Sequence, residues 1–172
     1  QLNPGATCAQ AGCSTTGTYA NLTGTPSIGQ YGCLGSTPNA NWLALGISTS
    51  GSIHLKLTQI GTNGNPVDVD FALYGPYTSV ATGCPISSST PTIDCSFSGS
   101  NIEYVDIANA LAGQVYILLT TNFGLQQGTI NLSQSPVIPS IGTINCNINF
   151  TGTVTLTDAT CGFSNGSAIV TP

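Results

Sequence analysis

Short runs in which apolar and polar residues alternate recur along this chain, and they constrain its fold more than any other feature. The clearest run is VDVDFALY, where Val67, Val69, Phe71 and Leu73 fall on one side of an extended backbone. Comparable runs, separated by turn sequences such as TNGNP and SFSGSN, are NWLALGIS, SIHLKLTQ, EYVDI, GQVYILLTT and GTINLSQ. Many short strands with this punctuation predict an all-β protein, an antiparallel β-sandwich or jelly roll.

Two prolines interrupt the pattern in the segment SQSPVIPSIG, residues 133–142. Proline cannot donate a hydrogen bond to a sheet, so this segment is typical of a linker or an edge crossing. We therefore predict a β-sandwich over residues 1–134, a linker over 135–142 and a short β-rich extension over 143–172. About 30 residues cannot bury a core alone. The extension must pack on the sandwich, begin a further domain, or complete a neighbouring molecule.

Charged residues are scarce, with one lysine, no arginine and six acids giving a net charge of −5. Proteins that bind nucleic acids neutralise phosphates with lysine and arginine, and anionic lipid surfaces attract the same residues. No apolar run approaches the roughly 20 residues that a membrane span needs. We therefore predict neither a nucleic-acid partner nor membrane insertion, and a polar surface made of hydroxyl and amide groups.

Seven cysteines without a C-x-x-C pair favour disulfides over a zinc site. Disulfides persist in oxidising compartments, which predicts an extracellular or cell-surface location. We expect three bridges: Cys84 with Cys95, Cys146 with Cys161, and Cys33 with Cys8 or Cys13. One thiol stays unpaired under this scheme, and spacing alone leaves the connectivity open.

Asp68 and Asp70 place two carboxylates two positions apart in a chain that otherwise avoids charge. Because apolar residues occupy the odd positions, we expect both acids on a solvated strand face, roughly 7 Å apart. With oxygen atoms from Asn63 or Asn65 in the preceding turn, they are candidate calcium ligands, and calcium is the one cofactor considered. The alternative is a solvated strand face without a ligand. A glycosidase pair would need one carboxylate with a raised pKa beside a sugar cleft, which this pattern does not predict.

No motif for nucleophilic catalysis surrounds a serine or cysteine, and His54 is the sole histidine. His54 alternates outward with Lys56, which is typical of a surface residue rather than a general base. We therefore predict no catalytic residue and no enzymatic activity. Trp42, Tyr74 and Tyr77 are candidates for a platform that stacks on sugars, although aromatic residues of a sandwich more often fill its core and rim.

Three stretches between about residues 30 and 124 carry a resemblance to a known family. They are the Cys-Leu and P-N-x-x-W entry in YGCLGSTPNANW, the block DVDFALYGP, and the run NALAGQVYILLTTNF. Together they resemble a β-sandwich domain of large secreted surface proteins of Bacteroidota, which often carry gliding-motility-associated, type IX secretion signals. The final TVTLTDATCGFSNGSAIVTP resembles the opening of the Ig-like repeat in SprB-like gliding adhesins, of which only the first strands are present.

This resemblance implies an exported cell-surface or filament component with an adhesive role, and it supplies no catalytic residues. Low charge also reduces repulsion between closely packed copies. We expect a non-enzymatic adhesin or a subunit of a filament or array. Its expected partners are itself or neighbouring domains, reached through the C-terminal strands, and surface glycans. The alternative is a carbohydrate-binding module attached to a secreted enzyme.

Overall fold

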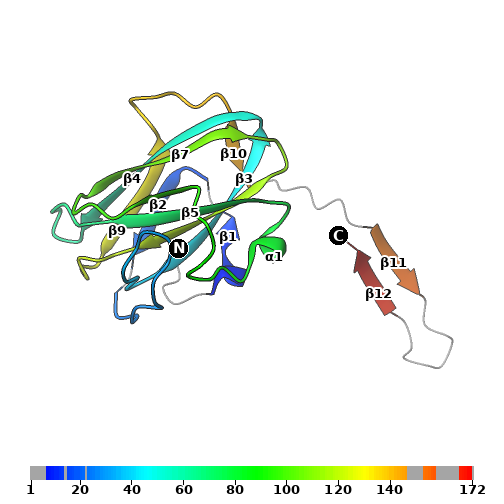
Figure 1. Cartoon of the computed structure of the whole chain (residues 1–172), viewed down its shortest axis with the longest axis horizontal. Helices are drawn as coiled ribbons and strands as arrows, with labels where there is room; N and C mark the ends of the chain where they lie inside the picture. The colour runs from blue at the N-terminus through cyan, green and yellow to red at the C-terminus, as the bar shows by residue number, and fades with distance from the viewer. Residues whose placement is uncertain (1–6, 14, 22, 147–152, 158–166, 172) are drawn as a thin grey trace.

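The computed structural model describes residues 7–13, 15–21, 23–146, 153–157 and 167–171 (Figure 1). Two main sheets lie face to face. Sheet A has the strand order β1 (Gly12–Cys13), β3 (Asn41–Thr49), β8 (Val115–Thr121), β5 (Asp70–Tyr77) and β6 (Asp94–Ser96), and β10 (Thr143–Asn145) also pairs with β3. Sheet B has the order β2 (Gly17–Asn21), β9 (Gly128–Gln134), β4 (Gly51–Gly61) and β7 (Ile102–Ala110). The predicted all-β sandwich is confirmed.

All strand pairs in both sheets are antiparallel except the short contact between β1 and β3. The described helical segments are a single 3-10 turn η1 (Cys8–Gln10) and the four-residue helix α1 (Val80–Gly83). A further hairpin pairs β11 (Thr153–Thr157) with β12 (Ser167–Thr171). No helix among the described residues is long and apolar enough to cross a membrane.

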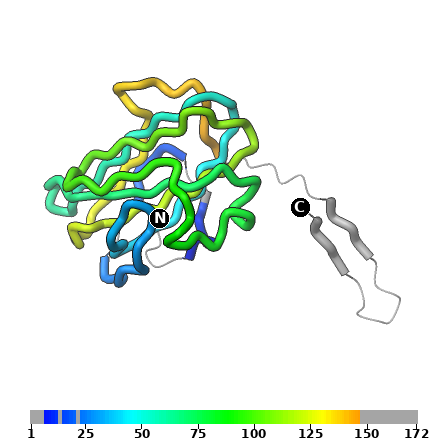
Figure 2. The backbone as a smooth tube through the Cα atoms, viewed as in Figure 1, coloured from blue at the N-terminus to red at the C-terminus, as the bar shows by residue number. Residues whose placement is uncertain are grey.

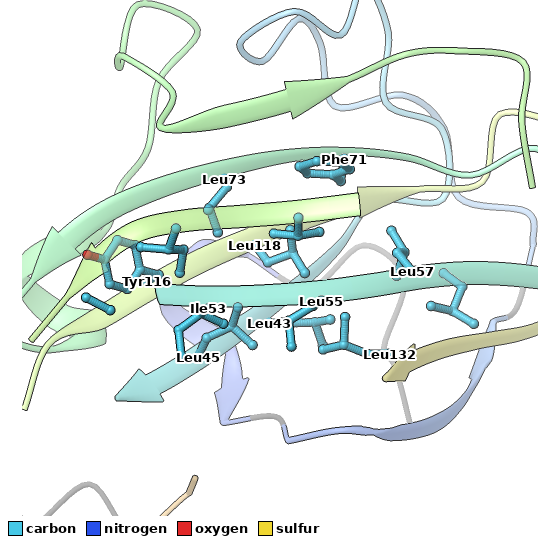
Figure 3. Packing of buried hydrophobic residues seen from close by; sticks show 14 of the residues in the cluster. Leu43, Leu45, Ile53, Leu55, Leu57, Phe71, Leu73, Tyr116, Leu118 and Leu132 are labelled. Atoms are coloured by element: carbon cyan, nitrogen blue, oxygen red, sulfur yellow. The ribbon is translucent and has the colours of Figure 1, made fainter. Parts of the chain in front are cut away.

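Sheet B follows the predicted alternation, because one of its faces packs on the core and the other does not. In β4 the side chains of Ile53, Leu55 and Leu57 are fully buried, whereas those of His54 and Lys56 are half-buried on the opposite face. These inward residues meet those of sheet A in one apolar layer (Figure 3). Its labelled members are Leu43, Leu45, Ile53, Leu55, Leu57, Phe71, Leu73, Tyr116, Leu118 and Leu132.

Sheet A is buried on both faces, which the sequence pattern did not predict. Every residue of β8 is buried, so its run VYILL needs no polar alternation. A second apolar cluster, here called the cover cluster, fills the outer face of sheet A; it contains Cys8, Leu34, Ala40, Trp42, Ala72, Tyr74, Ile86, Ile117 and Leu119. Cys8, Leu34 and Ile86 come from segments outside the strands of the sheet, which lie against the body of the sandwich (Figure 2).

Two disulfides fasten this cover, and they correct the predicted pairing. Cys8 bonds to Cys84 and Cys33 bonds to Cys95, so the expected Cys84–Cys95 bridge and the expected partner of Cys33 were wrong. The bridges join cover segments to distant parts of the chain, not cysteines that follow one another in sequence. Cys146 is also disulfide-bonded, while its predicted partner Cys161 lies outside the described residues.

The sandwich extends past the boundary expected at residue 134. Thr143–Asn145 forms β10 and pairs with β3 in sheet A. Between β9 and β10, the backbone amides of Ile141 and Gly142 both donate to the carbonyl of Ser52 in β4. The segment expected to be a linker therefore lies along β4 and leads the chain from sheet B to sheet A.

One carboxylate joins the edge strands of the two sheets. Asp94 lies in β6 of sheet A, and its two oxygens accept hydrogen bonds of 2.8 Å from the backbone amides of Cys95 and of Asp106 in β7. Since β6 and β7 end their respective sheets, this side chain closes the sandwich along one side.

Candidate functional site

Asp70 is buried, which contradicts the expectation of a solvated strand face. It begins β5, its residue is 5% exposed, and it pairs with Thr121 of β8. By the alternation of β5, its position falls on the same side of sheet A as Ala72 and Tyr74. Asp68, two residues earlier, is half-buried. Asp70 is therefore a buried carboxylate in a chain with few cations, and it needs a physical explanation.

The environment of Asp68 and Asp70 favours the protonated form of both. Burial is the largest cause that raises the pKa of Asp70, and together with the carboxylates of Asp68 and Glu103 it raises this pKa to about 7. Burial and Glu103 also raise the pKa of Asp68, while a hydrogen bond from the backbone of Val69 acts in the opposite sense. No cationic side chain offsets this repulsion. The three acids therefore form a coupled group at one end of the sandwich.

Glu103 belongs to this group, although the sequence reading gave it no role. It lies in β7 at an inward position, is 7% exposed, and accepts a hydrogen bond from the hydroxyl of Ser98. The signal that could have found it is the alternation in IEYVDI, which places Glu103 on the same side as Val105 and Ile107.

Asn122 follows β8 and adjoins the backbone of Asp68 across Gly124. It is fully buried, and its Nδ2 donates to the carbonyl of Gln126 at 2.7 Å. A Cβ atom built on Gly124 would lie 3.8 Å from the Asp68 backbone nitrogen and 3.9 Å from Asn122 Oδ1, so both groups adjoin this glycine. Asn63, one expected oxygen donor, is exposed, and its Oδ1 accepts from the Asn65 amide within the turn.

Three oxygens of this group accept no hydrogen bond from any described residue: Asp68 Oδ1, Asp70 Oδ1 and Asn122 Oδ1. We call Asp68, Asp70, Asn122 and Glu103 the acidic end. Within the described part of the chain, no three His, Cys, Asp or Glu side chains lie close enough together to hold a metal alone. An ion here would therefore need two carboxylates together with neutral oxygens. Asp70 has the raised pKa that a general acid needs, but its side chain is too deeply buried to reach a sugar.

His54 lies in β4 of sheet B. Its Nδ1 lies 2.7 Å from Oδ1 of Asp106, across the pair of strands β4 and β7. This contact is a salt bridge when the imidazole is protonated. The outward position predicted for His54 is confirmed. The pair ties two neighbouring strands of sheet B on their outer face.

Trp42 and Tyr74, two of the three residues expected to form a sugar platform with Tyr77, are buried, so the expected platform was wrong for them. Trp42 is 6% exposed and Tyr74 is fully buried, because both pack in the cover cluster. Tyr31 meets Trp42 edge to face, with ring centroids 5.5 Å apart. Tyr77 is half-buried against the same cluster. These aromatic rings hold the cover on sheet A and are not available to stack on a ligand.

Replacing Tyr74 with phenylalanine should leave the free energy of unfolding unchanged or raise it by up to about 1 kcal/mol. The Tyr74 hydroxyl is buried without a partner among the described residues, and burial raises its pKa. Urea denaturation of the two proteins checks this. A loss above about 1 kcal/mol would mean that the hydroxyl makes a hydrogen bond in solution, for example to a buried water.

Comparisons with known proteins give limited similarity. No family model matches the sequence, and no curated protein matches it. Among solved structures, the chain is similar to the pre-peptidase C-terminal domain of a collagenase from Bacillus anthracis, with 14% identity, a TM-score of 0.43, and coverage of 73% of this chain and 91% of that chain. It is also similar to a GH26-CBM35 β-(1,4)-mannanase from Podospora anserina, with 15% identity, a TM-score of 0.30, and coverage of 73% of this chain and 29% of that one. Similarity at this level says nothing about a ligand, and the resemblance to gliding-associated surface proteins stays a hypothesis.

Proposed function

We propose that this chain is a non-enzymatic module of an extracellular surface protein, and that it adheres to neutral polysaccharide through the outer face of sheet B. The observation that carries the proposal is the contrast between the two sheets. Sheet A is covered and cross-linked, whereas the outer face of sheet B has no covering segment among the described residues. The disulfides support an extracellular setting.

The chemistry of this face suits an uncharged ligand rich in hydroxyl groups. Cross-strand pairing places Ser133, Lys56 and Tyr104 in one row. In the neighbouring row, Asn131 donates from Nδ2 to the hydroxyl of Thr18 at 2.9 Å. Hydroxyl and amide side chains can exchange these hydrogen bonds for bonds to sugar hydroxyls. Tyr104 is 41% exposed and supplies an aromatic ring with a polar tip.

Binding of the full chain to a panel of neutral and acidic polysaccharides tests the proposal. We expect binding to a neutral member, and a loss of about tenfold in affinity when Tyr104 is replaced by alanine, which corresponds to about 1.4 kcal/mol. Phe97→Ala is the matched control, because Phe97 is 70% exposed but follows β6 of sheet A. Equal losses for both variants, or binding to acidic members alone, would refute the assignment of this face.

The alternative role, a carbohydrate-binding module of a secreted enzyme, uses the same face with a different ligand. Preference for an insoluble polysaccharide that secreted hydrolases degrade would favour it. Hydrolysis of any panel member that is lost in Asp70→Asn would instead contradict the non-enzymatic proposal.

A subunit of a filament or array is the second candidate, favoured by the hairpin of β11 and β12. These strands pair with each other and with no other described strand, and an isolated two-stranded hairpin is marginally stable in water. Strand addition to a neighbouring molecule would complete such a hairpin. Light scattering of the full chain should then show oligomers that a chain ending at Cys146 does not form; two monomeric samples would argue against this role.

A further inference from the structure

We infer that the acidic end is a calcium site, with Asp68, Asp70 and Asn122 as the side-chain ligands. This inference does not rest on the adhesive role, because the proposed ligands lie in or beside β5 and after β8, and Glu103 points inward from β7 rather than lying on the outer face of sheet B.

Three side-chain oxygens of the acidic end lack a hydrogen-bond donor in the described part of the chain. Asp70 is only 5% exposed and Asn122 is fully buried. The Oδ1 atom of each side chain nevertheless lacks a hydrogen-bond donor among the described residues. Oδ1 of Asp68 is in the same condition. Buried carboxylate and amide oxygens without donors cost free energy, and native proteins satisfy most of them. A cation bound by the two carboxylates would satisfy the oxygens of Asp68 and Asp70, and in our proposal Asn122, which adjoins the Asp68 backbone across Gly124, supplies the third oxygen.

Among the described residues, the negative charge of Asp68 and Asp70 has no positive side chain beside it to compensate it. Lys56 is the sole lysine or arginine in the chain, and it faces outward on sheet B opposite Tyr104. His54 is paired with Asp106 on that same face. Neither Lys56 nor His54 can therefore neutralise Asp68 and Asp70. A divalent ion compensates two neighbouring carboxylates where the protein supplies no positive group.

The chemistry of the ligands favours calcium over other ions. The candidate ligands are all oxygens, with no histidine nitrogen or cysteine sulfur, which disfavours zinc. Calcium accepts six to eight oxygens from carboxylates, amides, backbone carbonyls and water in flexible geometry. Magnesium demands near-ideal octahedral geometry, which side chains from two strand ends and a loop do not provide in advance. Backbone carbonyls and water would complete the coordination of calcium.

Calorimetric titration of calcium chloride into the chelator-treated full chain tests the site, together with thermal unfolding in calcium and in chelator. We expect one calcium ion per chain with a Kd of about 10⁻⁴–10⁻³ M, a higher Tm in calcium, and a smaller effect of magnesium. Absence of both binding heat and a Tm change at about 10 mM calcium would overturn the inference. Asp68 and Asp70 would then share a proton in place of an ion.

Two variants locate the binding. Asp70→Asn should weaken calcium binding at least about tenfold, whereas Asp106→Asn, which removes the same charge from an exposed position on β7, should bind as the natural chain does. Asn122→Asp adds a third carboxylate at the site and should tighten binding, which remains measurable if Asp70→Asn does not fold. Equal affinity in all folded variants would place the ion elsewhere and refute the site. Polysaccharide binding through Tyr104 is read separately, so either proposal can fail alone.

Discussion

Replacing both Cys33 and Cys95 with alanine is expected to lower the free energy of unfolding by about 4 kcal/mol. The bond closes a separation of 62 residues, and a loop of that length removes this much entropy from the unfolded chain in the loop-closure model. The bond also holds the cover next to Tyr74, because a Cβ on Gly32 would lie 3.4 Å from both Cys95 Sγ and the Tyr74 hydroxyl. Urea denaturation followed by the fluorescence of Trp42, the sole tryptophan, reports on this layer directly.

A matched comparison separates the disulfide from the cysteine side chains. Reduction of the unmutated protein also breaks Cys8–Cys84 and the bridge of Cys146, so its loss should be at least as large as that of the double variant, since the cross-links and not the sulfur atoms carry the effect. If the double variant loses less than about 1 kcal/mol and Trp42 stays shielded, the packing of the cover cluster alone holds it on sheet A.

Lowering the pH from 8 to 5 without calcium is expected to stabilise the chain through Asp70. The folded protein holds the pKa of Asp70 at about 7, because of burial and then of Asp68 and Glu103, whereas an unfolded aspartate has a pKa near 3.9. Between these values the folded state binds a proton that the unfolded state lacks, so stability falls as pH rises. The proton on Asp70 contributes its full stabilisation of the folded state below about pH 4, and this stabilisation is lost as the pH rises through 7. Its size is on the order of 2–4 kcal/mol.

Asp70→Asn isolates this contribution, because asparagine does not titrate. The difference in unfolding free energy between the natural chain and the variant, measured in chelator, should change across this pH range and then level off on the alkaline side. A difference that stays constant from pH 5 to 8 would show that Asp70 remains ionised in the folded protein.

The sequence predicted sheet B well and sheet A in part, for a physical reason. A strand with one wet face records its orientation in alternating side chains, as His54 and Lys56 do between buried leucines. A strand buried on both faces leaves no such record. The outer cover could be suspected from Ala72 and Tyr74, which are apolar at positions where VDVDFALY should turn to water.

The same cover explains why the candidate site was only half predicted. Asp68 and Asp70 were identified as a pair, but their environment depends on segments that arrive from elsewhere in the chain. Asn122 follows β8, which pairs with β5, and Glu103 lies in the other sheet, so strand pairing brings the first near and the packing of the two sheets brings the second. Disulfide connectivity failed likewise, since Cys8 and Cys84 meet across 76 positions.

The two disulfides also decide how the module would respond to tension. A force applied toward the N-terminus passes from Cys8 directly to Cys84, and the 76 positions between them cannot be drawn out while the bond is intact. Roughly 270 Å of potential extension is thereby withheld. The overlapping Cys33–Cys95 bond locks the chain up to β6 in the same way. In an oxidising medium, a surface protein built from such units would keep residues 8–95 at a nearly fixed length under a pull, and it would become more extensible on reduction.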